Sequence, residues 1–491
     1  MRKSRRRNPP LPPGPPSDPF IGHVRKIPAK NQDVTLYKLG KTYGDVIYLE
    51  MLGRPMIVLN SVKAAVDLLD KRSANYSDRP SFPVFKSMGW TETLTYTSYG
   101  KSFQKHRRLF KEHLKSTNVI LHMPTQTQEA RILLQNLLLD ESRREDWLRR
   151  FSTSIIMQVA YGHQIASDED PYLQMTEHIS HSLSNAGSPG NTPVDFFPIL
   201  NYLPSWFPGA YYAGFARKQR SAIRKLHDYP FYDVKAQLAA GTAKPSFVSH
   251  MLNTLDDVSD DSSDIVDIKG VAGQMYCAGA ETTWTTLTVF FLAMVLHPEC
   301  QKRAQREIDT IVGLGRLPQF QDRESLPYVE CILQETLRWN PVVPLGVPHR
   351  SLEDDVYRGM FIPKGSLVIA NTRGMALDEE VYTDPEKFNP SRYLPLPEGT
   401  QEPHPNGPFG FGRRICPGRR LADASIWIAM ASILATFDIL KPIGADGKEI
   451  TPDVEFSTGI TSRPSSFDCR IRPRNDQAKN LILHIDTSDN Y

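Results

Sequence analysis

The sequence predicts a mainly α protein with a small β subdomain, and three observations lead to this fold class. A Pro-free helical pattern spans residues 267–297 and stops at Pro298. At about 1.5 Å of rise per residue this helix is roughly 45 Å long, the width of a domain, so it must run through the middle of the molecule. Helical patterns also dominate residues 100–160, whereas the β-rich runs are short and few.

The remaining elements follow in chain order. Residues 44–60 predict a β-hairpin that turns at Leu52-Gly53-Arg54, and Ser61 is placed to cap a short helix after it. Later in the chain, the patterns predict helices over 299–312, 326–339 and from Pro417 to about Phe437, short strands between 340 and 372, and an irregular stretch over 376–415. An irregular stretch of that length inside a compact domain indicates a functional loop.

Composition narrows the function classes. The 491 residues are 40% hydrophobic, which is enough apolar material for a large core and excludes a disordered chain. The net charge of +3 gives no sign of a nucleic-acid-binding protein. Five cysteines without a C-x-x-C pair argue against a disulfide scaffold and a structural zinc cluster. With no internal repeat and no inter-domain linker, we expect one domain over residues 17–473.

The two ends differ from the body of the chain. Residues 1–16 combine a basic cluster with a Pro-rich run and contain no apolar segment, which is typical of a hinge that follows a membrane anchor. We therefore expect the sequence to begin just after a missing anchor, and a soluble protein with a basic tail is the alternative. Residues 474–491 are polar and are expected to form a frayed tail.

A segment rich in aromatic residues lies between residues 191 and 215. Eight aromatic side chains fall between Phe196 and Phe215, and prolines interrupt them. One interpretation is a buried irregular connection. The other is an apolar surface that enters a membrane or gates a lipophilic pocket.

The most specific motif is Phe409-Gly410-Phe411-Gly412-Arg413-Arg414-Ile415-Cys416-Pro417-Gly418. Cys416 stands at the start of a helix, where unpaired N–H groups and the positive end of the helix dipole favour a thiolate. Gly418 and the two glycines before it let a large flat ligand approach the backbone. A nucleophilic cysteine would need a histidine as base, and none is local. A single thiolate instead suits an iron that a macrocycle already holds, as in haem with a proximal cysteine, where the thiolate favours O–O cleavage.

This motif resembles the F-x-x-G-x-x-x-C-x-G haem signature of the cytochrome P450 (haem-thiolate monooxygenase) superfamily. The resemblance extends from the Pro-rich start to about residue 473, and it is strongest to microsomal members of filamentous fungi that act in secondary metabolism. It implies a single-domain cytochrome P450 fold around a buried haem b (iron protoporphyrin IX). It also implies that Cys416 is the axial iron ligand, that Phe409 packs near the sulfur and that Arg414 pairs with a haem propionate.

An E-x-x-R motif supports the resemblance. Glu335 and Arg338 lie three residues apart and share one helix face. Together with Arg392, in the segment 388–393, they resemble the Glu-Arg-Arg triad of the family, which holds the irregular loop beneath the haem as a fully paired buried network. An exposed helical ion pair is the alternative.

The long helix contains Ala278-Gly279-Ala280-Glu281-Thr282-Thr283, which fits a further family segment. Ala278 and Gly279 have almost no side chain, so that a ligand can lie directly against the helix backbone. The Thr282 hydroxyl can bond back to a carbonyl and open the helix, while Glu281 supplies an acid. Oxygen activation needs two protons, and an acid–alcohol pair can relay them. The alternative is a helix crossing in the core that only tolerates small residues.

Haem carboxylates need cations. Arg107 matches the arginine of the family's W-x-x-x-R motif, but the tryptophan position is Phe103 here. Pairing at this corner therefore rests on Arg107 alone or with His106. His349 resembles the His or Arg that follows the E-x-x-R helix and reaches a propionate, and a solvated loop histidine is the alternative.

The resemblance also suggests residues for the substrate pocket and for docking of a redox partner. The pocket candidates are Met275, Ala278, Gly279, Val342, Val343, Leu345, Val347 and Ile460. A basic docking patch is expected from Lys105, Arg108, Arg413, Arg419 and Arg420, with ordinary solvated charge as the alternative.

The predicted function is a haem-dependent monooxygenase that inserts one oxygen atom of O2 into a lipophilic small molecule. Electrons would come from NADPH through a separate NADPH–cytochrome P450 reductase, with cytochrome b5 as a further candidate donor, and no nucleic acid takes part. The expected location is the endoplasmic reticulum membrane, with the catalytic domain facing the cytoplasm. Two rival functions are a haem-thiolate isomerase or dehydratase that needs no reductase, and a non-catalytic haem-binding sensor.

Overall fold

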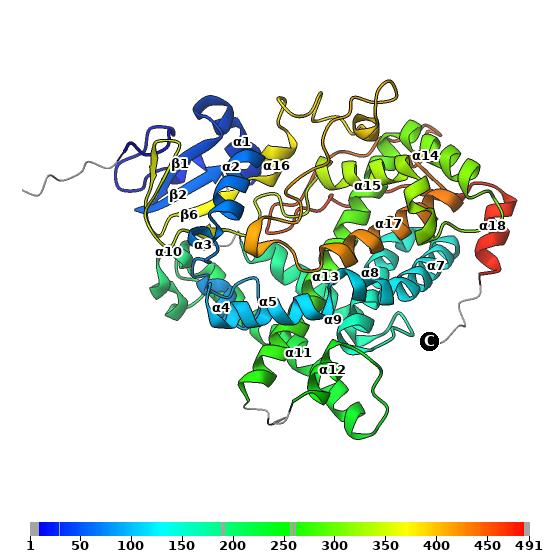
Figure 1. Cartoon of the computed structure of the whole chain (residues 1–491), viewed down its shortest axis with the longest axis horizontal. Coiled ribbons are helices and arrows are strands. Elements are labelled where there is room, and N and C mark those ends of the chain that lie inside the picture. The colour runs from blue at the N-terminus through cyan, green and yellow to red at the C-terminus, as the bar shows by residue number, and fades with distance from the viewer. Residues whose placement is uncertain (1–8, 29, 188–191, 256–258, 260–261, 486–491) are drawn as a thin grey trace, which may run out of the picture.

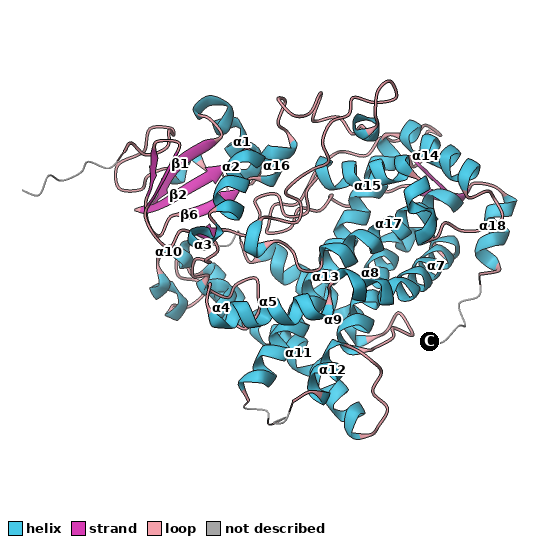
Figure 2. Cartoon of the chain, in the orientation of Figure 1, coloured by secondary structure: helices cyan, strands magenta, loops and turns pink. Residues whose placement is uncertain are grey.

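A small β-rich region lies beside a large helical region in the computed structural model (Figure 1), which describes residues 9–28, 30–187, 192–255, 259 and 262–485. Most of the strands gather at one end of the molecule, and helices make up nearly all of the rest (Figure 2). The structure is mainly α with a small β subdomain, as the sequence predicts.

The strands form three small sheets. The largest has the strand order β1–β2–β6–β3, and the other two are the pairs β4–β5 and β7–β8. The strands are β1 (Val46–Met51), β2 (Arg54–Leu59), β3 (His349–Arg350), β4 (Asp355–Tyr357), β5 (Met360–Ile362), β6 (Leu367–Ala370), β7 (Phe437–Leu440) and β8 (Arg470–Pro473). Strands β1 and β2 form the predicted antiparallel hairpin, whereas β2 and β6 run parallel with Ile57 opposite Val368. The first hairpin therefore shares a sheet with the last third of the chain.

The helices match the predicted pattern closely in position. Up to the long helix they are α1 (Gln32–Tyr43), α2 (Val62–Ala65), α3 (Ser73–Tyr76), α4 (Pro83–Met88), α5 (Lys101–His113), α6 (Ser116–Val119), α7 (Met123–Leu139), α8 (Arg144–Tyr161), α9 (Pro171–Asn185), α10 (Pro193–Phe196), α11 (Tyr211–Ala239), α12 (Phe247–Asn253) and α13 (Ser263–Leu296). After it come α14 (Pro298–Ile311), α15 (Pro327–Trp339), α16 (Thr372–Ala376), α17 (Arg419–Thr436) and α18 (Asp476–Leu483). Short 3-10 helices are η1 (Val24–Lys26), η3 (Ile120–His122), η4 (Glu141–Arg143), η5 (Pro198–Tyr202), η6 (Phe320–Ser325), η7 (Pro390–Tyr393) and η8 (Gly412–Arg414), and η2 (Val66–Lys71) is a π-helix.

Helix α13 runs through the centre of the helical region (Figure 1). Glycines let its neighbours come close: a Cβ atom on Gly273 would collide with the ring of His227 in α11, and one on Gly279 would lie 2.7 Å from Cγ1 of Ile156 in α8. Within the described part of the chain, α13 alone is long and apolar enough to cross a membrane, but 83% of its most apolar window is buried inside the protein. Its apolar character therefore serves the core.

The core has one large helical cluster and two smaller ones on the two faces of the largest sheet. The helical cluster joins α7, α8, α13, α15 and α17. Strand residues that alternate in sequence point to opposite faces, so Ile57 packs in one sheet cluster and Val58 in the other. The sheet is thus covered on both sides, and it is anchored on the helical region.

The described residues near both ends are more ordered than the sequence suggests, and residues 486–491 of the expected tail lie outside them. The Pro-rich residues 9–16 are docked rather than free: Tyr48 N donates to Pro13 O at 2.9 Å and Phe361 N to Pro10 O at 2.7 Å. Residues 1–8 lie outside the described residues. At the other end, α18 replaces the first part of the expected frayed tail. Asn475 caps this helix, and the buried Ile482 packs it on the core, which the polar composition of 474–491 conceals.

The aromatic segment lies at the surface next to the sheet. Tyr202 is 85% exposed and Trp206 80% exposed, and Ile199 and Tyr211 are also exposed. Phe196 in α10 holds the segment against the sheet, with the guanidinium of Arg54 5.2 Å from its ring centroid. These exposures contradict the interpretation of the segment as a buried connection.

His113, at the end of α5, makes stability depend on pH. Burial above all, together with the charges of His122 and His250, lowers the pKa of His113 from 6.5 to about 4. Its Nε2 atom is buried without a hydrogen-bond partner among the described residues. The His113 imidazole takes up a proton near pH 6.5 in the unfolded chain but only near pH 4 in the folded chain. The free energy of unfolding therefore falls as the pH falls between these values.

We expect His113→Gln to remove about 2 kcal/mol of the stability difference between pH 7.5 and pH 5, measured by urea unfolding at the two pH values. His484→Gln, which changes an exposed histidine, serves as the control. An identical pH dependence in the wild type and the His113→Gln protein would show that His113 does not titrate in this way.

Candidate functional site

The loop that carries Cys416 is fixed by backbone contacts. Cys416 N donates to Phe409 O at 2.8 Å, which closes the loop on itself. Gly410 and Gly412 have φ values of +74° and +55°, in the left-handed region that favours glycine. A Cβ atom on Gly412 would collide with the carbonyl oxygen of Leu69 in η2. The motif therefore keeps its glycines because the loop turns tightly and is pressed against η2.

The thiol of Cys416 faces groups that favour a thiolate. Burial raises the pKa of Cys416, whereas the backbone N–H groups of Gly418 and Arg419 and the charges of Arg107 and Arg419 lower it. A Cβ atom on Gly418 would meet nothing within 4 Å, so the backbone beside the sulfur leaves room for a flat ligand. A thiol in this position is a suitable metal ligand, since metal binding overcomes the cost of burying the thiolate.

Three arginine side chains and one histidine gather between the Cys416 loop and the sheet. Arg414 donates to the carbonyl oxygens of Ser77, Leu94 and Thr97. His349 Nδ1 lies 2.7 Å from Tyr76 O, and burial with the charges of Arg79 and Arg414 lowers the pKa of His349. Arg107 Nη1 donates to Ile415 O at 2.6 Å. These residues come from segments far apart in the chain and meet at one place.

Arg79 is the fourth of these side chains, and the sequence alone did not point to it. It is buried and donates to the carbonyl oxygens of Thr95, Val347 and Pro348. Burial, and then the charge of Arg414, lower the pKa of Arg79 well below its ordinary value. No local pattern around residue 79 could have identified it, because its position depends on contacts with a segment far along the chain.

This donor set fits a haem. The carboxylate beside the cations is Asp78, which already accepts from Arg350 Nε at 2.7 Å and Tyr99 N at 2.7 Å. Buried arginines without an adequate acidic partner are costly, so the cluster suits a ligand that carries carboxylates of its own. A lone thiol, an open backbone at Gly418 and a cationic cluster to one side together match the iron and the two propionates.

Glu335, Arg338 and Arg392 form one buried network. Arg338 donates to both carboxylate oxygens of Glu335 at 2.7 Å, and Arg392 Nε donates to Oε1 at 3.1 Å. The remaining donors of Arg338 reach the carbonyl oxygens of Ala376 and Pro385. All three charged side chains are almost completely buried. The alternative of an exposed helical ion pair is therefore wrong, and the network ties α15 to the irregular loop that precedes Cys416.

On α13, Thr282 and Glu281 have different surroundings. Thr282 Oγ1 donates to Ala278 O at 2.7 Å, one turn back along the helix. Glu281 is buried, and burial raises the pKa of its carboxyl group. Its Oε1 accepts from Thr461 Oγ1 at 3.4 Å. The acid and the alcohol are thus adjacent in sequence, but their role as a proton relay stays a prediction.

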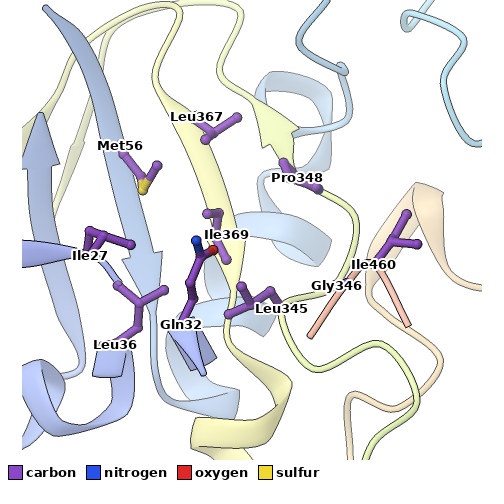
Figure 3. A pocket seen from close by; sticks show the side chains of 11 residues that line it. Ile27, Gln32, Leu36, Met56, Leu345, Gly346, Pro348, Leu367, Ile369 and Ile460 are labelled. Atoms are coloured by element: carbon purple, nitrogen blue, oxygen red, sulfur yellow. The ribbon is translucent and has the colours of Figure 1, made fainter. Parts of the chain in front are cut away.

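The pocket candidates separate into several groups. Leu345 and Ile460 line a cavity of about 30 Å³ against α1 and the sheet (Figure 3), together with Ile369. Val342, Val343 and Val347 are half-buried in the same connection after α15, Met275 is buried, and Ala278 is half-buried on α13.

Gly279 requires a correction. Its Cα faces Ile156 of α8, so the absent side chain allows two helices to pack and does not open a surface to a ligand.

Two basic residues that the sequence assigns to the docking patch or to the haem carboxylates contact aspartates of α13 instead. Lys105 bonds to Asp264 and Asp267 of α13, so it is not a free charge of a docking patch. His106 Nε2 lies 2.8 Å from Asp267 Oδ1, which leaves Arg107 without His106 as a second group for the haem carboxylate.

Phe103, which stands at the tryptophan position of the family motif, stacks on Arg414. The guanidinium carbon lies 3.8 Å from the ring centroid.

The other members of the docking patch lie in the Cys416 loop or directly after it, except Arg108, which lies on α5. Arg108, Arg413 and Arg420 are exposed, and Arg419 is half-buried with Nη1 3.2 Å from Cys416 O. Arg413 also bonds to the hydroxyl of Tyr99. A smaller patch of three exposed arginines therefore remains from the five cations.

Comparison with known proteins agrees with this geometry. A family model described as Cytochrome P450 matches residues 12–467. Cytochrome P450 monooxygenase 136 of Postia placenta is 40% identical over 491 aligned residues, which cover 98% of this chain and 92% of the relative. Cytochrome P450 monooxygenase ARMGADRAFT_974139 of Armillaria gallica is 40% identical over 97% of this chain and 94% of its own. Cytochrome P450 monooxygenase ple1 of Rhodocybe pseudopiperita is 39% identical, with 96% and 91% covered.

Proposed function

Because the chain belongs to the cytochrome P450 family and is a haem monooxygenase, we propose that it inserts one oxygen atom of O2 into a C–H or C=C bond of a lipophilic small molecule. The observation that carries this proposal is the position of Cys416, with N–H groups directed at its sulfur, an open backbone beside it and a cationic cluster within the same site. The apolar side chains Met275, Val342, Val343 and Leu345 favour a lipophilic substrate.

The prosthetic group is haem b in this proposal, held by the Cys416 thiolate and by Arg79, Arg107, His349 and Arg414. When bound, it supplies the iron that activates O2. The chain's own residues do the rest. Burial raises the pKa of the Glu281 carboxyl group, which suits it to take up and release a proton. The Thr282 hydroxyl, which donates to Ala278 O, can turn from that carbonyl to pass a proton on.

Electrons come from NADPH through a separate reductase in this proposal, because the sequence contains no flavin or dinucleotide motif. Arg413 and Arg420 flank Cys416 in the sequence, and together with Arg108 of α5 these exposed arginines suit an acidic docking surface on the reductase or on cytochrome b5. Charge of this kind mainly increases the association rate, so the effect of replacing these arginines should weaken as the salt concentration rises.

The test of the function is turnover by the haem-loaded protein. A library of terpenoids, polyketides, fatty acids and aromatic compounds is first titrated for spectral shifts, and compounds that bind are then incubated with reductase, NADPH and O2. Oxygenated products that require NADPH support the proposal. Products formed without NADPH favour the isomerase or dehydratase, and binding without any product favours a haem sensor. The fungal origin of the similar monooxygenases supports our further proposal that the protein acts in fungal secondary metabolism.

The exposed aromatic segment suggests location at a membrane surface, with the endoplasmic reticulum membrane as the proposed compartment. Tyr202, Trp206 and Tyr211 combine an apolar ring with a polar tip, which suits the level of the lipid headgroups. We expect the described body of the protein to bind phosphatidylcholine vesicles through this segment.

Replacing Tyr202 and Trp206 by serine should lower vesicle binding at least about tenfold, because two large exposed rings leave the interface. Flotation of vesicles with bound protein measures this change. The control replaces the exposed Leu139 by serine, on α7 far along the chain from the aromatic segment. Equal binding of the wild type and the double variant would rule out this segment as the contact surface.

A further inference from the structure

One face of the central helix α13 is accessible although the helix is deep in the protein. From residue 270 to residue 295 every residue is buried except Gln274, Ala278, Gly279 and Thr282. Gly279 packs against α8, whereas the other three are spaced four residues apart and therefore share one face. Because α13 runs through the centre of the helical region (Figure 1), this face borders an interior space and not the outer surface.

Gln274 is the polar residue of this face that lies farthest from Thr282. Its Oε1 atom accepts a hydrogen bond from Thr95 N at 3.3 Å. A backbone N–H can only donate, so the side-chain oxygen of Gln274 belongs to this bond and the Nε2 amide group is directed elsewhere. Within the described residues, Nε2 has no hydrogen-bond partner. The accessible face of α13 thus carries an unused N–H donor group.

Tyr96, the residue after Thr95, is held by two aromatic side chains. Its ring stacks on Phe85 of α4, with 4.6 Å between the ring centroids, and meets Phe82 edge-on at 5.6 Å. These contacts involve the ring alone. The position of the Tyr96 side chain is therefore fixed without any bond to its hydroxyl group.

The Tyr96 hydroxyl faces the same interior space as Gln274. Burial raises the pKa of Tyr96 well above its ordinary value, the thiol of Cys277 also raises it, and Arg79 lowers it. The side chain is nevertheless only half-buried, a combination that Cys416 also shows. A deep side chain with accessible surface borders a cavity. Cys277 lies three residues after Gln274 on α13, which places the hydroxyl near the Gln274 amide.

A buried polar group without a partner is costly, so two such groups at one cavity suit a ligand that bonds to both. Within the part of the chain that the structure describes, the Tyr96 hydroxyl has no partner either. We propose that Gln274 and Tyr96 determine substrate specificity by binding one uncharged oxygen atom of the substrate, a hydroxyl or carbonyl oxygen that accepts from both side chains. Neither side chain carries a charge, which favours such an oxygen over a carboxylate.

The spacing along α13 also defines where the substrate carries this oxygen. At about 1.5 Å per residue, Gln274 lies about 12 Å from Thr282 along the helix axis. Thr282 marks the reacting end of the site under the proposed function, on which this inference rests. The substrate is therefore a lipophilic compound that already contains oxygen at one end and is oxygenated at a C–H or C=C bond near the other end.

The test uses N-alkylimidazoles, because the free imidazole nitrogen of these compounds binds haem iron and fixes one end of the chain. A series of chain lengths, from well below to well above the about 12 Å between the two residues, is compared with the same compounds that carry a terminal hydroxyl group. The shift of the haem absorption measures each dissociation constant. In the wild type, the hydroxyl group should tighten binding about tenfold at intermediate chain lengths, where it reaches both side chains, and weaken binding in short chains.

Tyr96→Phe is the decisive variant, because it removes the hydroxyl and keeps the ring on Phe85. It should reduce the gain from the terminal hydroxyl group severalfold and leave the binding of plain alkylimidazoles unchanged. Gln274→Leu should do the same, although it also loses the bond to Thr95 N. The matched control is Tyr161→Phe on α8, since the Tyr161 hydroxyl is buried without a partner among the described residues but its side chain has almost no accessible surface.

Two results would overturn the inference. One is a gain from the hydroxyl group that does not depend on chain length, and the other is a gain that both Tyr96→Phe and Gln274→Leu retain. If the alkylimidazoles bind but the hydroxyl group brings no gain at any length, the inference fails while the proposed function stands. If none of them shifts the haem absorption of the wild type, the haem site itself is wrong, and the proposed function fails together with the inference.

Discussion

The Cys416→Ala protein is expected to lose completely the absorption that carbon monoxide gives with reduced, thiolate-bound haem, and to lose NADPH-dependent turnover with it. Cys416 is the one sulfur that the loop 409–418 presents beside an open backbone, with the N–H groups of Gly418 and Arg419 directed at it. Alanine offers no ligand to iron, so neither the spectrum nor the electron donation that favours O–O cleavage can remain. The measurement is the difference spectrum of the reduced protein with and without carbon monoxide.

The matched control for this experiment is Cys331→Ala. Cys331 is buried on α15, and burial raises the pKa of its thiol to about 12, as expected for an inert core cysteine. This variant should keep the spectrum with at most a small loss of stability. If Cys416→Ala kept the spectrum, the axial ligand would be another residue, and the assignment of the whole site would be wrong.

Glu335→Gln should destabilise the protein by roughly 3–5 kcal/mol and sharply reduce haem retention, the largest stability effect that we expect from a substitution of similar shape. Glu335 accepts from Arg338 twice, from Arg392, from Tyr393 Oη at 2.8 Å and from the backbone N–H of Asn389 at 2.8 Å. The amide of glutamine cancels the negative charge and replaces an acceptor by a donor, which leaves the buried Arg338 without its acidic partner and Arg392 with Glu402 alone.

The same substitution on the same helix provides the control. Glu330 pairs with Arg323 at 2.8 Å, but both side chains are 24% exposed, so Glu330→Gln should cost no more than about 1 kcal/mol. Urea unfolding and the ratio of haem to protein after purification measure both variants. Equal losses of unfolding free energy in the two variants would mean that burial does not determine how much the Glu335 network contributes to stability.

Periodicity and turn chemistry predicted the parts of the fold that depend on local sequence. The long helix expected over 267–297 is α13, Ser263–Leu296, because nothing in that stretch breaks a helix and its residues are apolar on nearly every side. The hairpin over 44–60 is β1 and β2, and its turn at Leu52-Gly53 has the positive φ values that glycine favours. Helix α11 shows the limit of such rules, since Pro230 lies inside it.

Contacts between distant segments could not be read from the sequence. Arg79 joins the cationic cluster only because residues 347–348 come to lie beside it, and Lys105 leaves the docking patch because two aspartates of α13 reach it first. Gly279 looked like part of a ligand surface, but the direction of its missing side chain depends on how α8 packs. The motif identified which residue types are needed, whereas only the packing decides what each one faces.

The parallel pairing of β2 with β6 has a consequence for the order of assembly in the cell. The first hairpin leaves the ribosome long before residues 367–370 exist, so one edge of β2 has to wait unpaired, and exposed edges of this kind invite aggregation. The groups that we propose to hold the haem are divided in the same way, with Arg79 and Arg107 made early and His349, Arg414 and Cys416 made late. Capture of the haem is therefore a late event of biosynthesis, and nascent chains that stall before residue 416 cannot be rescued by supplying more haem.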